Sequence, residues 1–442
     1  MTRLDYLKLL TEQIRCKKAR LMIEEEYQAH IDDQKLDFMA QGMSEAEAEE
    51  AAVREMGDPV EAGVQLDRIH RPKMDMKLIA MIVILGISGV AIQVFLERTA
   101  ILCGAGDYLA ESYNPAGLKC ILWTAAGSIL MLGVCFVDYT LLGKYALRIW
   151  AAMMILMALY RVLGRTVNGI YPKQGLFYCV LVPVFAGIVF RFRGAGKQGM
   201  MKCILILVLS TVLPLVLNSS VYMILFYMTG VCILILAVHK RWFGREKKRQ
   251  YILMAGVTAV IPAGILGIMV STGQLFLAAY QSDRLKQIFS FRSSENYMYQ
   301  IVLENLRKAA DAVAGREGVI IDESTNMIWS EVRSDYVWVF IFKVIGTWQG
   351  ILFTFALAGF LGALIWIVRK QKNQLGYVVG MACVLMMAAE ILVYLGMNSG
   401  VFYPVSVYLP FFSYGGSNMM VTYLYMGILL SITRNQNIVK AG

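Results

Sequence analysis

Two acidic residues just before a long apolar segment are the strongest candidates for chemistry in this sequence. The stretch WSEVRSDYVWVFIFKVIG, residues 329–346, contains Glu331 and Asp335. If a helix already runs here, a spacing of four places both carboxylates on one face. A carboxylate at the boundary between water and a membrane can take a proton from a hydroxyl group or bind a divalent cation. The alternative is that these acids only favour the N-terminus of the following helix through its macrodipole.

A second motif, LPFFSYGGSNMM at residues 409–420, stands before the apolar run MVTYLYMGILLSI. Pro410 breaks helical geometry, and Gly415 and Gly416 allow backbones to approach closely. The motif also carries three polar side chains, those of Ser413, Tyr414 and Ser417. Irregular backbone at membrane depth is tolerated only where it lines a cavity or is buried in protein. The motif therefore predicts a cavity wall, and the alternative is a tight helix crossing built on small residues.

The composition divides the chain into an acidic head and a very apolar body. The 442 residues are 58% hydrophobic, a larger apolar fraction than that of a soluble domain. The mean hydropathy is +0.56. Residues 1–73 hold 11 basic and 16 acidic residues, so the rest of this +10 chain carries +15. That positive charge lies in short loops, which indicates membrane topology rather than nucleic-acid binding. The eight cysteines form no CxxC pair and only three histidines occur, so no disulfide framework or histidine metal site is expected.

The head, residues 1–73, has the sequence pattern of a small helical domain. Apolar residues at helical spacing lead up to Gly42, a candidate C-terminal glycine. Ser44 with Glu47 predicts a capping box, and Asp58 followed by proline predicts another helix start. The stretch GMSEAEAEEAAVREMGDP resembles the permease-prefix (HAAS-like) cytoplasmic domains that precede membrane proteins in Gram-positive bacteria. We expect this domain to bind a cytoplasmic protein or to regulate the body.

The body, residues 76–442, repeats apolar runs of the length that crosses a bilayer. An all-α, polytopic membrane protein with ten transmembrane helices is predicted. The eighth run is too long for one straight span, so its first turns are expected above the bilayer. The ten runs lie at about 77–95, 118–137, 145–163, 174–192, 202–217, 220–238, 251–271, 338–368, 376–396 and 414–433.

The basic loops predict the orientation of the spans. Three loops rich in lysine and arginine, 191–202, 239–250 and 369–374, fall on one side when ten spans are counted from the head. Basic short loops mark the cytoplasmic side, so both termini are predicted to be cytoplasmic in a bacterial plasma membrane. The opposite side carries a large extracellular loop, residues 272–335. It is too polar to span and too long for a mere connection, which makes it a functional candidate.

The C-terminal motif resembles the shape, elongation, division and sporulation family, whose members include FtsW, RodA and SpoVE. The stretch LPFFSYGGSNMMVTYLYMGILLSI is similar, without gaps, to that family's last-span signature, and the likeness covers residues 76–442. WSEVRSD looks like the family motif with the essential catalytic aspartate, so Asp335 matches that aspartate and Glu331 its adjacent glutamate. DRLKQIFSF resembles a family segment whose arginine matches Arg284, and Gln300 matches part of a Tyr-Gln pair.

The resemblance implies a peptidoglycan glycosyltransferase that polymerises lipid II at the outer face of the plasma membrane, in division, elongation or sporulation. It also implies a divalent cation, Mg or Mn, with Asp335 as its candidate ligand, and a class B penicillin-binding protein as partner. Basic residues on the outer side would neutralise the departing lipid pyrophosphate. The candidates are Arg165, Lys173 and Arg333, and interfacial snorkelling is the alternative for them.

The chain departs from the family pattern at several positions, which marks a divergent branch. Lys343-Val344 stands where the family often has Glu-Glu, and Glu390 lies inside the ninth span. Because an unpaired charge inside a membrane is costly, Lys343 and Glu390 are expected to pair. The departures leave two alternatives to the enzyme. One is a non-catalytic regulator or scaffold of cell-wall synthesis, and the other is a lipid II transporter.

Overall fold

The computed structural model describes most of the chain, and its regular structure is helical throughout the described part. The described residues fall into two compact units. The first comprises residues 1–75, 371–373 and 432–442, and the second comprises residues 76–370 and 374–431. Residues described are 1–102, 116–164, 174–215, 220–272, 299–300, 302–304, 333–403, 405–436 and 438.

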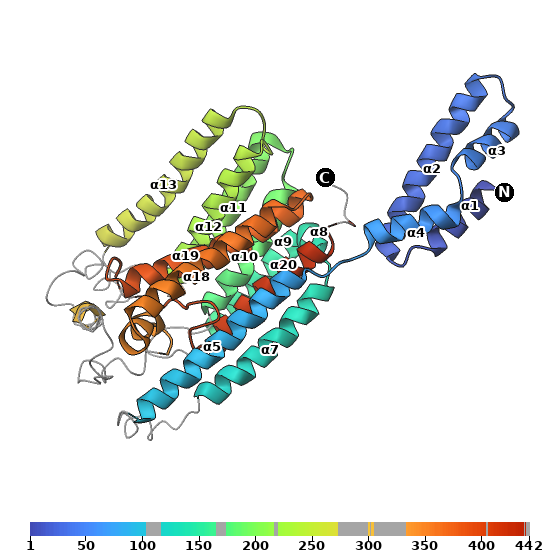
Figure 1. The fold of residues 1–442 in the computed structure, drawn as a ribbon. Coiled ribbons are helices and arrows are strands. Elements are labelled where there is room, and N and C mark those ends of the chain that lie inside the picture. Colours follow the sequence, from blue (N-terminus) through green and yellow to red (C-terminus); the bar gives the residue numbers. More distant parts are fainter. Residues whose placement is uncertain are drawn as a thin grey trace. The chain divides into compact units, whose positions relative to one another are not determined.

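The head is built from four helices (Figure 1). The capping box predicted at Ser44 and Glu47 is confirmed. The Ser44 side chain accepts from the Glu47 backbone amide, and the Glu47 carboxylate accepts from the Ser44 backbone amide and hydroxyl. The Asp58 carboxylate accepts a hydrogen bond from the Val60 amide at the start of the last helix. Gly42 adopts a left-handed backbone conformation with φ of 97°, as a helix-ending glycine should. The helices are α1 (Arg3–Glu12), α2 (Lys17–Ala40), α3 (Glu45–Glu55) and α4 (Pro59–His70).

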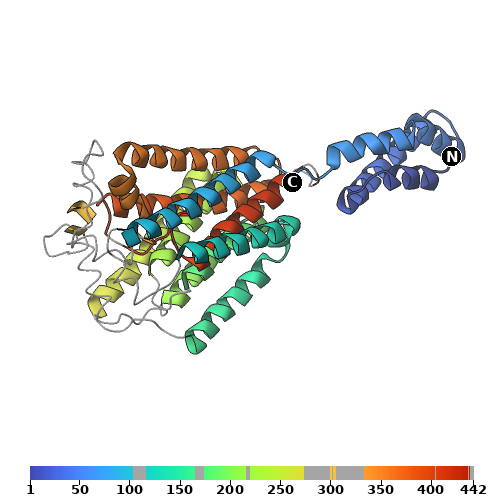
Figure 2. The ribbon, with the colours of Figure 1, turned by 60° about the horizontal axis from the view of Figure 1, so that its bottom comes forward.

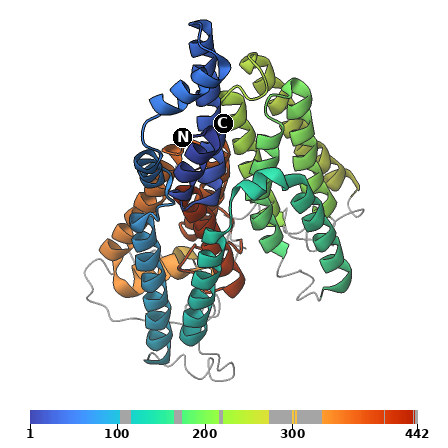
Figure 3. The same ribbon diagram turned by 90° about the vertical axis from the view of Figure 1, so that its right-hand side faces the viewer.

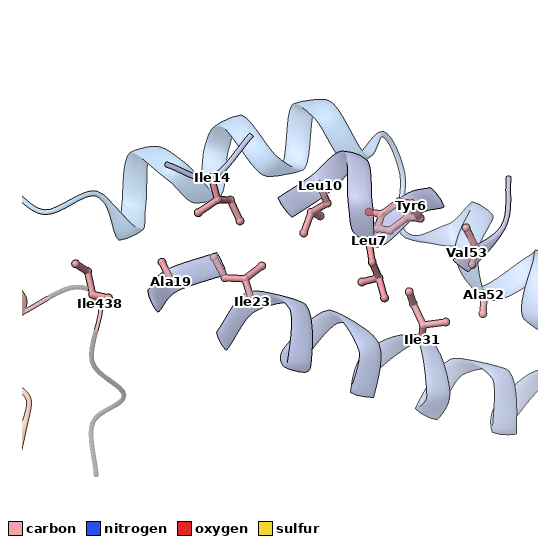
Figure 4. Close-up of a cluster of buried hydrophobic side chains, with 10 residues drawn as sticks. All are labelled: Tyr6, Leu7, Leu10, Ile14, Ala19, Ile23, Ile31, Ala52, Val53 and Ile438. Atoms are coloured by element: carbon pink, nitrogen blue, oxygen red, sulfur yellow. The ribbon is translucent and has the colours of Figure 1, made fainter. Parts of the chain in front are cut away.

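The core of the head is a cluster of buried apolar side chains (Figure 4). The Tyr6 hydroxyl donates to the Met56 carbonyl at 3.1 Å, which satisfies the one polar group that this ring brings inside. Ile438, from the segment that follows the last helix of the chain, belongs to the same cluster. The cluster consists of Tyr6, Leu7, Leu10, Ile14, Ala19, Ile23, Ile31, Ala52, Val53 and Ile438.

The body contains ten long apolar helices among the described residues, and each overlaps one of the predicted runs. Five of them, α5, α7, α12, α18 and α19, are long and apolar enough to cross a membrane within the described residues. The chain is therefore a multi-pass membrane protein, and the count of ten spans stays a prediction. The helices run broadly alongside one another (Figure 2). They are α5 (Met76–Leu102), α7 (Ala116–Phe136), α9 (Ala146–Leu163), α10 (Gln174–Arg191), α11 (Gly196–Leu215), α12 (Ser220–His239), α13 (Lys247–Thr272), α18 (Thr347–Arg369), α19 (Gln374–Asn398) and α20 (Gly416–Arg434).

Helices α10 and α19 form the centre of the body, and α5 and α7 lie at its edge. Two thirds of the α19 span, 67%, is buried, against 28% for α5 and 22% for α7. Helix α19 packs on α10, α12 and α18, while α5 packs beside α7 (Figure 3). Helix α20 reaches the α5–α7 pair through the Tyr423 ring, which lies against Gly86 and Gly127. Its Tyr425 hydroxyl donates to the Cys179 carbonyl of α10 at 2.7 Å.

The eighth apolar run is not one straight helix, in agreement with its predicted excess length. It begins as α17 (Val337–Phe340) and the π-helical turn η1 (Ile341–Ile345), and Gly346 with φ of 129° separates these from α18. The Trp338 indole donates to the Thr354 hydroxyl at 2.9 Å, so the short first part folds back on the start of α18. This break fixes the residues directly before α17, where Asp335 lies.

Candidate functional site

Asp335, Arg333 and the C-terminal motif that contains Ser413, Tyr414 and the two glycines meet at one end of the body. Helices α5 and α19 end there and α20 begins there, because successive helices alternate in direction. Two irregular segments occupy this end. One is the turn Arg333–Asp335 before α17, called here the aspartate turn, and the other is the segment 405–415 before α20, called here the glycine segment.

Asp335 faces the glycine segment with its side chain. Its Oδ2 accepts a hydrogen bond from the Ser406 hydroxyl at 3.2 Å. Burial and the neighbouring Asp335 carboxylate together raise the pKa of the Tyr408 phenol, which places that ring within electrostatic reach. The backbone carbonyl of Asp335 accepts from the Asn398 amide at 2.8 Å, at the last residue of α19. The side chain and the backbone of the aspartate are thus held by different elements.

The other two carbonyl groups of the aspartate turn are also held. The Ser413 hydroxyl donates to the Ser334 carbonyl, and the Tyr394 hydroxyl of α19 lies 3.4 Å from the same oxygen. The Arg333 carbonyl accepts from the backbone N–H of Tyr414 at 2.7 Å. Polar groups inside a membrane body must find partners, and here the partners are one another. The Ser-Tyr pair of the motif therefore anchors the turn that carries the aspartate.

The two motif glycines are required by close packing. A Cβ at Gly416 would overlap the indole ring of Trp123 on α7, and one at Gly415 would lie 2.8 Å from the Tyr408 ring. The Ser413 hydroxyl also accepts from the Leu409 amide at 2.8 Å, which closes the turn of the motif on itself. Both glycines thus serve the close approach that the sequence predicted for them.

The motif also lines a small cavity. Its volume is about 10 Å³, at the lower limit for holding one water molecule. This cavity is far too small for a sugar and Asp335 does not line it, so a ligand-binding cavity at the motif stays a prediction. The lining residues are Glu390, Tyr408, Leu409, Pro410, Phe411, Ser413, Asn418, Met419, Val421 and Thr422.

Arg333 supplies positive charge next to Asp335. Its side chain is half-buried, and within the described ranges its guanidinium forms no ion pair. Burial raises the pKa of the Tyr414 phenol, and the nearby Arg333 charge opposes that rise. The guanidinium is thus close to the motif and available to an anionic group.

Several predicted site residues lie elsewhere or beyond the described residues. Gln300 is exposed, and its buried neighbour Tyr299 packs near Gly400 of the segment after α19. Ser417 lies half-buried in the first turn of α20. Four predicted residues fall outside the described residues, namely Glu331, Arg284, Arg165 and Lys173.

The predicted pair between Lys343 and Glu390 does not occur among the ion pairs of the described chain. Glu390 is 7% exposed and accepts from the Cys179 thiol of α10, with Sγ and Oε1 3.7 Å apart. Lys343 lies in η1, which folds against α18 rather than against α10. The prediction used the depth of each residue along its apolar run, and that depth does not specify which helix face a side chain occupies.

Four residues that hold the aspartate turn were not singled out from the sequence: Gln93 of α5, Tyr394 and Asn398 of α19, and Ser406 of the glycine segment. Gln93 and Asn398 are completely buried. An amide side chain inside an otherwise apolar membrane helix is rare enough to indicate a specific partner. That signal was available in the sequence, but the partner's identity was not.

The described residues offer a partial ligand set for a divalent cation. No group of three or more His, Cys, Asp or Glu side chains gathers within the described ranges. Mg²⁺ is commonly held by one or two carboxylates together with substrate phosphates, and it keeps several waters. Asp335, with the Ser406 hydroxyl beside it, fits one carboxylate of such a site.

The sequence comparisons point to one family. Residues 178–438 match the FTSW_RODA_SPOVE family model, described as a cell cycle protein. A probable peptidoglycan glycosyltransferase FtsW of Synechocystis is 24% identical over 183 residues, 40% of this chain and 45% of that protein. The peptidoglycan glycosyltransferase MrdB of Escherichia coli K12 is 25% identical over 181 residues, 40% of this chain and 48% of that protein. The chain thus matches about half the length of these relatives.

Solved structures share the fold over most of the chain. A protein from a structure of a peptidoglycan synthase complex matches with a TM-score of 0.61 at 15% identity, covering 82% of this chain and 98% of that chain. The rod shape determining protein RodA of Thermus thermophilus matches with a TM-score of 0.51 at 14% identity, covering 82% and 97%. The family model spans more than half of this chain, including the aspartate turn and the glycine segment. The chain therefore belongs to the FtsW, RodA and SpoVE family of cell cycle proteins.

Proposed function

We propose that this protein is a peptidoglycan glycosyltransferase that polymerises lipid II into glycan strands at the outer face of the plasma membrane. The observation that carries the proposal is the aspartate turn: a carboxylate, with a guanidinium two residues away, on a backbone held at all three carbonyl groups. Rigid placement of a reacting group is what catalysis requires. The family and the names of the relatives support the same reaction.

The proposed chemistry uses Asp335 as a general base. An Oδ atom of Asp335 takes the proton of the 4-hydroxyl group of one lipid II. The oxygen left behind attacks the anomeric carbon of the growing chain, and the bond between that carbon and the lipid pyrophosphate breaks. The pyrophosphate leaves with the bonding electron pair. General base catalysis by a positioned side chain contributes about 10²- to 10⁴-fold to a rate.

The leaving pyrophosphate requires neutralisation. The Arg333 guanidinium, half-buried beside Asp335 and without an ion pair in the described part, is the described residue suited to that contact. Arginine binds phosphate oxygens through two parallel N–H donors. A divalent cation held by Asp335 and the pyrophosphate oxygens would supply further positive charge when bound.

We further propose that both termini are cytoplasmic, that a class B penicillin-binding protein is the membrane partner, and that residues 1–73 contact a cytoplasmic protein. The basic loops after α10, α12 and α18 support this orientation. A likeness to a member of a peptidoglycan synthase complex supports the partnership.

Purified protein, lipid II and Mg²⁺ or Mn²⁺, scored for glycan polymer, test the proposal. Asp335→Asn is expected to lower polymer formation at least about 100-fold, because the amide cannot accept the proton. Asp138→Asn is the matched control. The Asp138 carboxylate accepts a hydrogen bond from the Thr140 amide at the start of the short helix α8 (Thr140–Lys144), and the side-chain oxygen of asparagine can accept the same bond.

Equal polymer from the wild-type protein and Asp335→Asn would overturn the role of the aspartate. No polymer from the wild-type protein, alone or with a penicillin-binding protein, would overturn the polymerase. Movement of labelled lipid II across vesicles would then identify a transporter, and its absence a scaffold.

A further inference from the structure

Gln93 places a buried amide in the middle of the apolar helix α5. Its side chain is completely buried, and its Nε2 donates two hydrogen bonds. One goes to the Arg333 carbonyl of the aspartate turn at 2.9 Å, and the other to the Phe412 carbonyl of the glycine segment at 2.6 Å. A single amide group therefore connects three parts of the chain that are distant in sequence.

The surface of α5 around Gln93 fits the glycine segment closely. Gly89 lies one turn before Gln93 on the same face, and a Cβ there would overlap the Phe411 carbonyl oxygen. Phe411 has a left-handed backbone conformation with φ of 68°, which is uncommon for a residue other than glycine. Its ring makes edge contacts with the rings of Phe360 and Tyr423, at 5.8 and 5.5 Å between centroids. The helix thus approaches a backbone that is already fixed.

Gln93 is also placed well inside the helix. It lies more than two turns before the last residue of α5. The hydrogen bond to the Arg333 carbonyl is therefore made from the interior of the helix and not from its end. Asn398 and Tyr394 hold the turn from α19, and Ser413 and Tyr414 hold it from the glycine segment. Among these contacts, Gln93 is the one contributed by α5. It joins the edge helix of the body to the turn that carries Asp335.

We infer that Gln93 is a positioning residue, which fixes the aspartate turn against the glycine segment and thereby aims the Asp335 carboxylate. Its effect on catalysis rests on the proposed function, while its effect on the turn does not. Gln93 is completely buried and donates its hydrogen bonds to backbone carbonyls of the turn and the segment, so it acts on substrate through Asp335. Its own Oε1 is buried and accepts no hydrogen bond from a described residue. Replacing the amide with an apolar group of similar shape thus removes two donors and leaves no new buried acceptor on the side chain.

Gln93→Met in the full-length protein tests the inference, because methionine keeps the length of the side chain without the donors. The expected results are at least a tenfold fall in kcat on lipid II, less than a twofold change in KM, and at least tenfold faster hydrogen exchange of the amides at Ser334–Tyr336. Gln93→Asn, which is one methylene shorter, should change both readouts in the same direction by less. Tyr227→Phe is the control, since it removes a hydrogen bond to the Thr258 carbonyl, between α12 and α13, and none to the turn or the glycine segment.

Unchanged exchange at the aspartate turn in Gln93→Met would overturn the inference. Uniformly faster exchange across α10 and α19 would also overturn it, since that result means a general loss of stability. If Gln93→Met does not fold, the same two readouts on Gln93→Asn decide. If the wild-type protein makes no polymer, the proposed function fails, and the exchange at the turn still decides whether Gln93 positions it.

Discussion

Asp335 is held by one exposed and one buried side chain, and the difference between them matters for function. The Ser406 hydroxyl contacts the carboxylate itself at 3.2 Å, where solvent can replace it. The buried Asn398 amide donates to the Asp335 carbonyl at 2.8 Å and to the Tyr394 carbonyl at 3.0 Å. When a buried carbonyl loses its hydrogen-bond donor, the folded state is destabilised by the full desolvation free energy of that group. The Asn398 hydrogen bond, although it does not touch the carboxylate, should therefore matter more for function than the Ser406 hydrogen bond.

Substitution of these residues should separate the two roles. Asn398→Ala is expected to lower kcat on lipid II about tenfold, since an unsatisfied buried carbonyl costs about 1–3 kcal/mol. Ser406→Ala should lower kcat only about twofold, because water can take the place of the hydroxyl. Ser399→Ala is the control, since its exposed hydroxyl bonds only the local Gly396 carbonyl. Steady-state polymerisation measures all three, and a larger effect from Ser406→Ala would contradict this ranking.

At the scale of elements, the site depends on close approach between α5, α7 and the glycine segment. Gly89 of α5 faces the Phe411 carbonyl, and Gly416 at the start of α20 faces the Trp123 ring of α7. The obstacle at Gly89 is a backbone atom, which cannot rotate away as a side chain can. Gly89 is therefore the position at which one methyl group should separate α5 from the segment.

Gly89→Ala is expected to lower the thermal stability of the body by several degrees and polymerisation by at least tenfold, because α5 must shift and carries Gln93 with it. Gly133→Ala in α7 is the matched control, since a Cβ there would meet nothing within 4 Å. Alanine also favours a helix more than glycine does, so the control should be neutral or slightly stabilising. A melting curve in detergent measures both variants, and equal behaviour would show that α5 and the segment are not tightly fitted.

The elements that are local in sequence could be predicted, and the contacts between distant elements could not. Ser44 with Glu47 lies within one helical turn, and the apolar runs are recognised by their length alone. The motif serines and glycines were recognised as a packed, polar feature, but their partner was not. Gln93 and the Arg333 carbonyl are 240 positions apart, and no periodicity connects them. The Lys343–Glu390 prediction was wrong for the same reason, because a sequence does not show which helices face each other.

For the whole molecule, the two compact units both bury apolar side chains. The acidic head also joins α2 to α3 by ion pairs. The Lys35 ammonium lies 2.9 Å from a Glu45 carboxylate oxygen and 3.0 Å from one of Glu49. The hydrogen bond from Lys35 lowers the pKa of Glu45 from its ordinary value of 4.5. A lowered pKa in the folded state stabilises the head above that ordinary value, and this contribution is lost as the pH falls through the lowered pKa.

Acid should therefore loosen the head before the body. Limited proteolysis between pH 7 and pH 3.5 is expected to show cleavage within residues 1–75 increasing below about pH 4.5, while the body stays intact. Lys35→Met should weaken this dependence on pH, because the ordinary Glu45 pKa is then restored in the folded state. Lys8→Met is the control, since Lys8 makes no ion pair among the described residues. Equal pH dependence in the wild-type protein and Lys35→Met would contradict the prediction.

The position of Ile438 has a consequence for how the chain is made. The ribosome releases the head first, yet this isoleucine belongs to the buried cluster in the head's core, at the end where Ala19 lies. Burying one isoleucine side chain contributes about 1.5–3 kcal/mol. The nascent head must therefore wait, less stable than in the finished protein, while every membrane segment is translated and inserted. The head therefore reaches its full stability only after residue 438 has been translated.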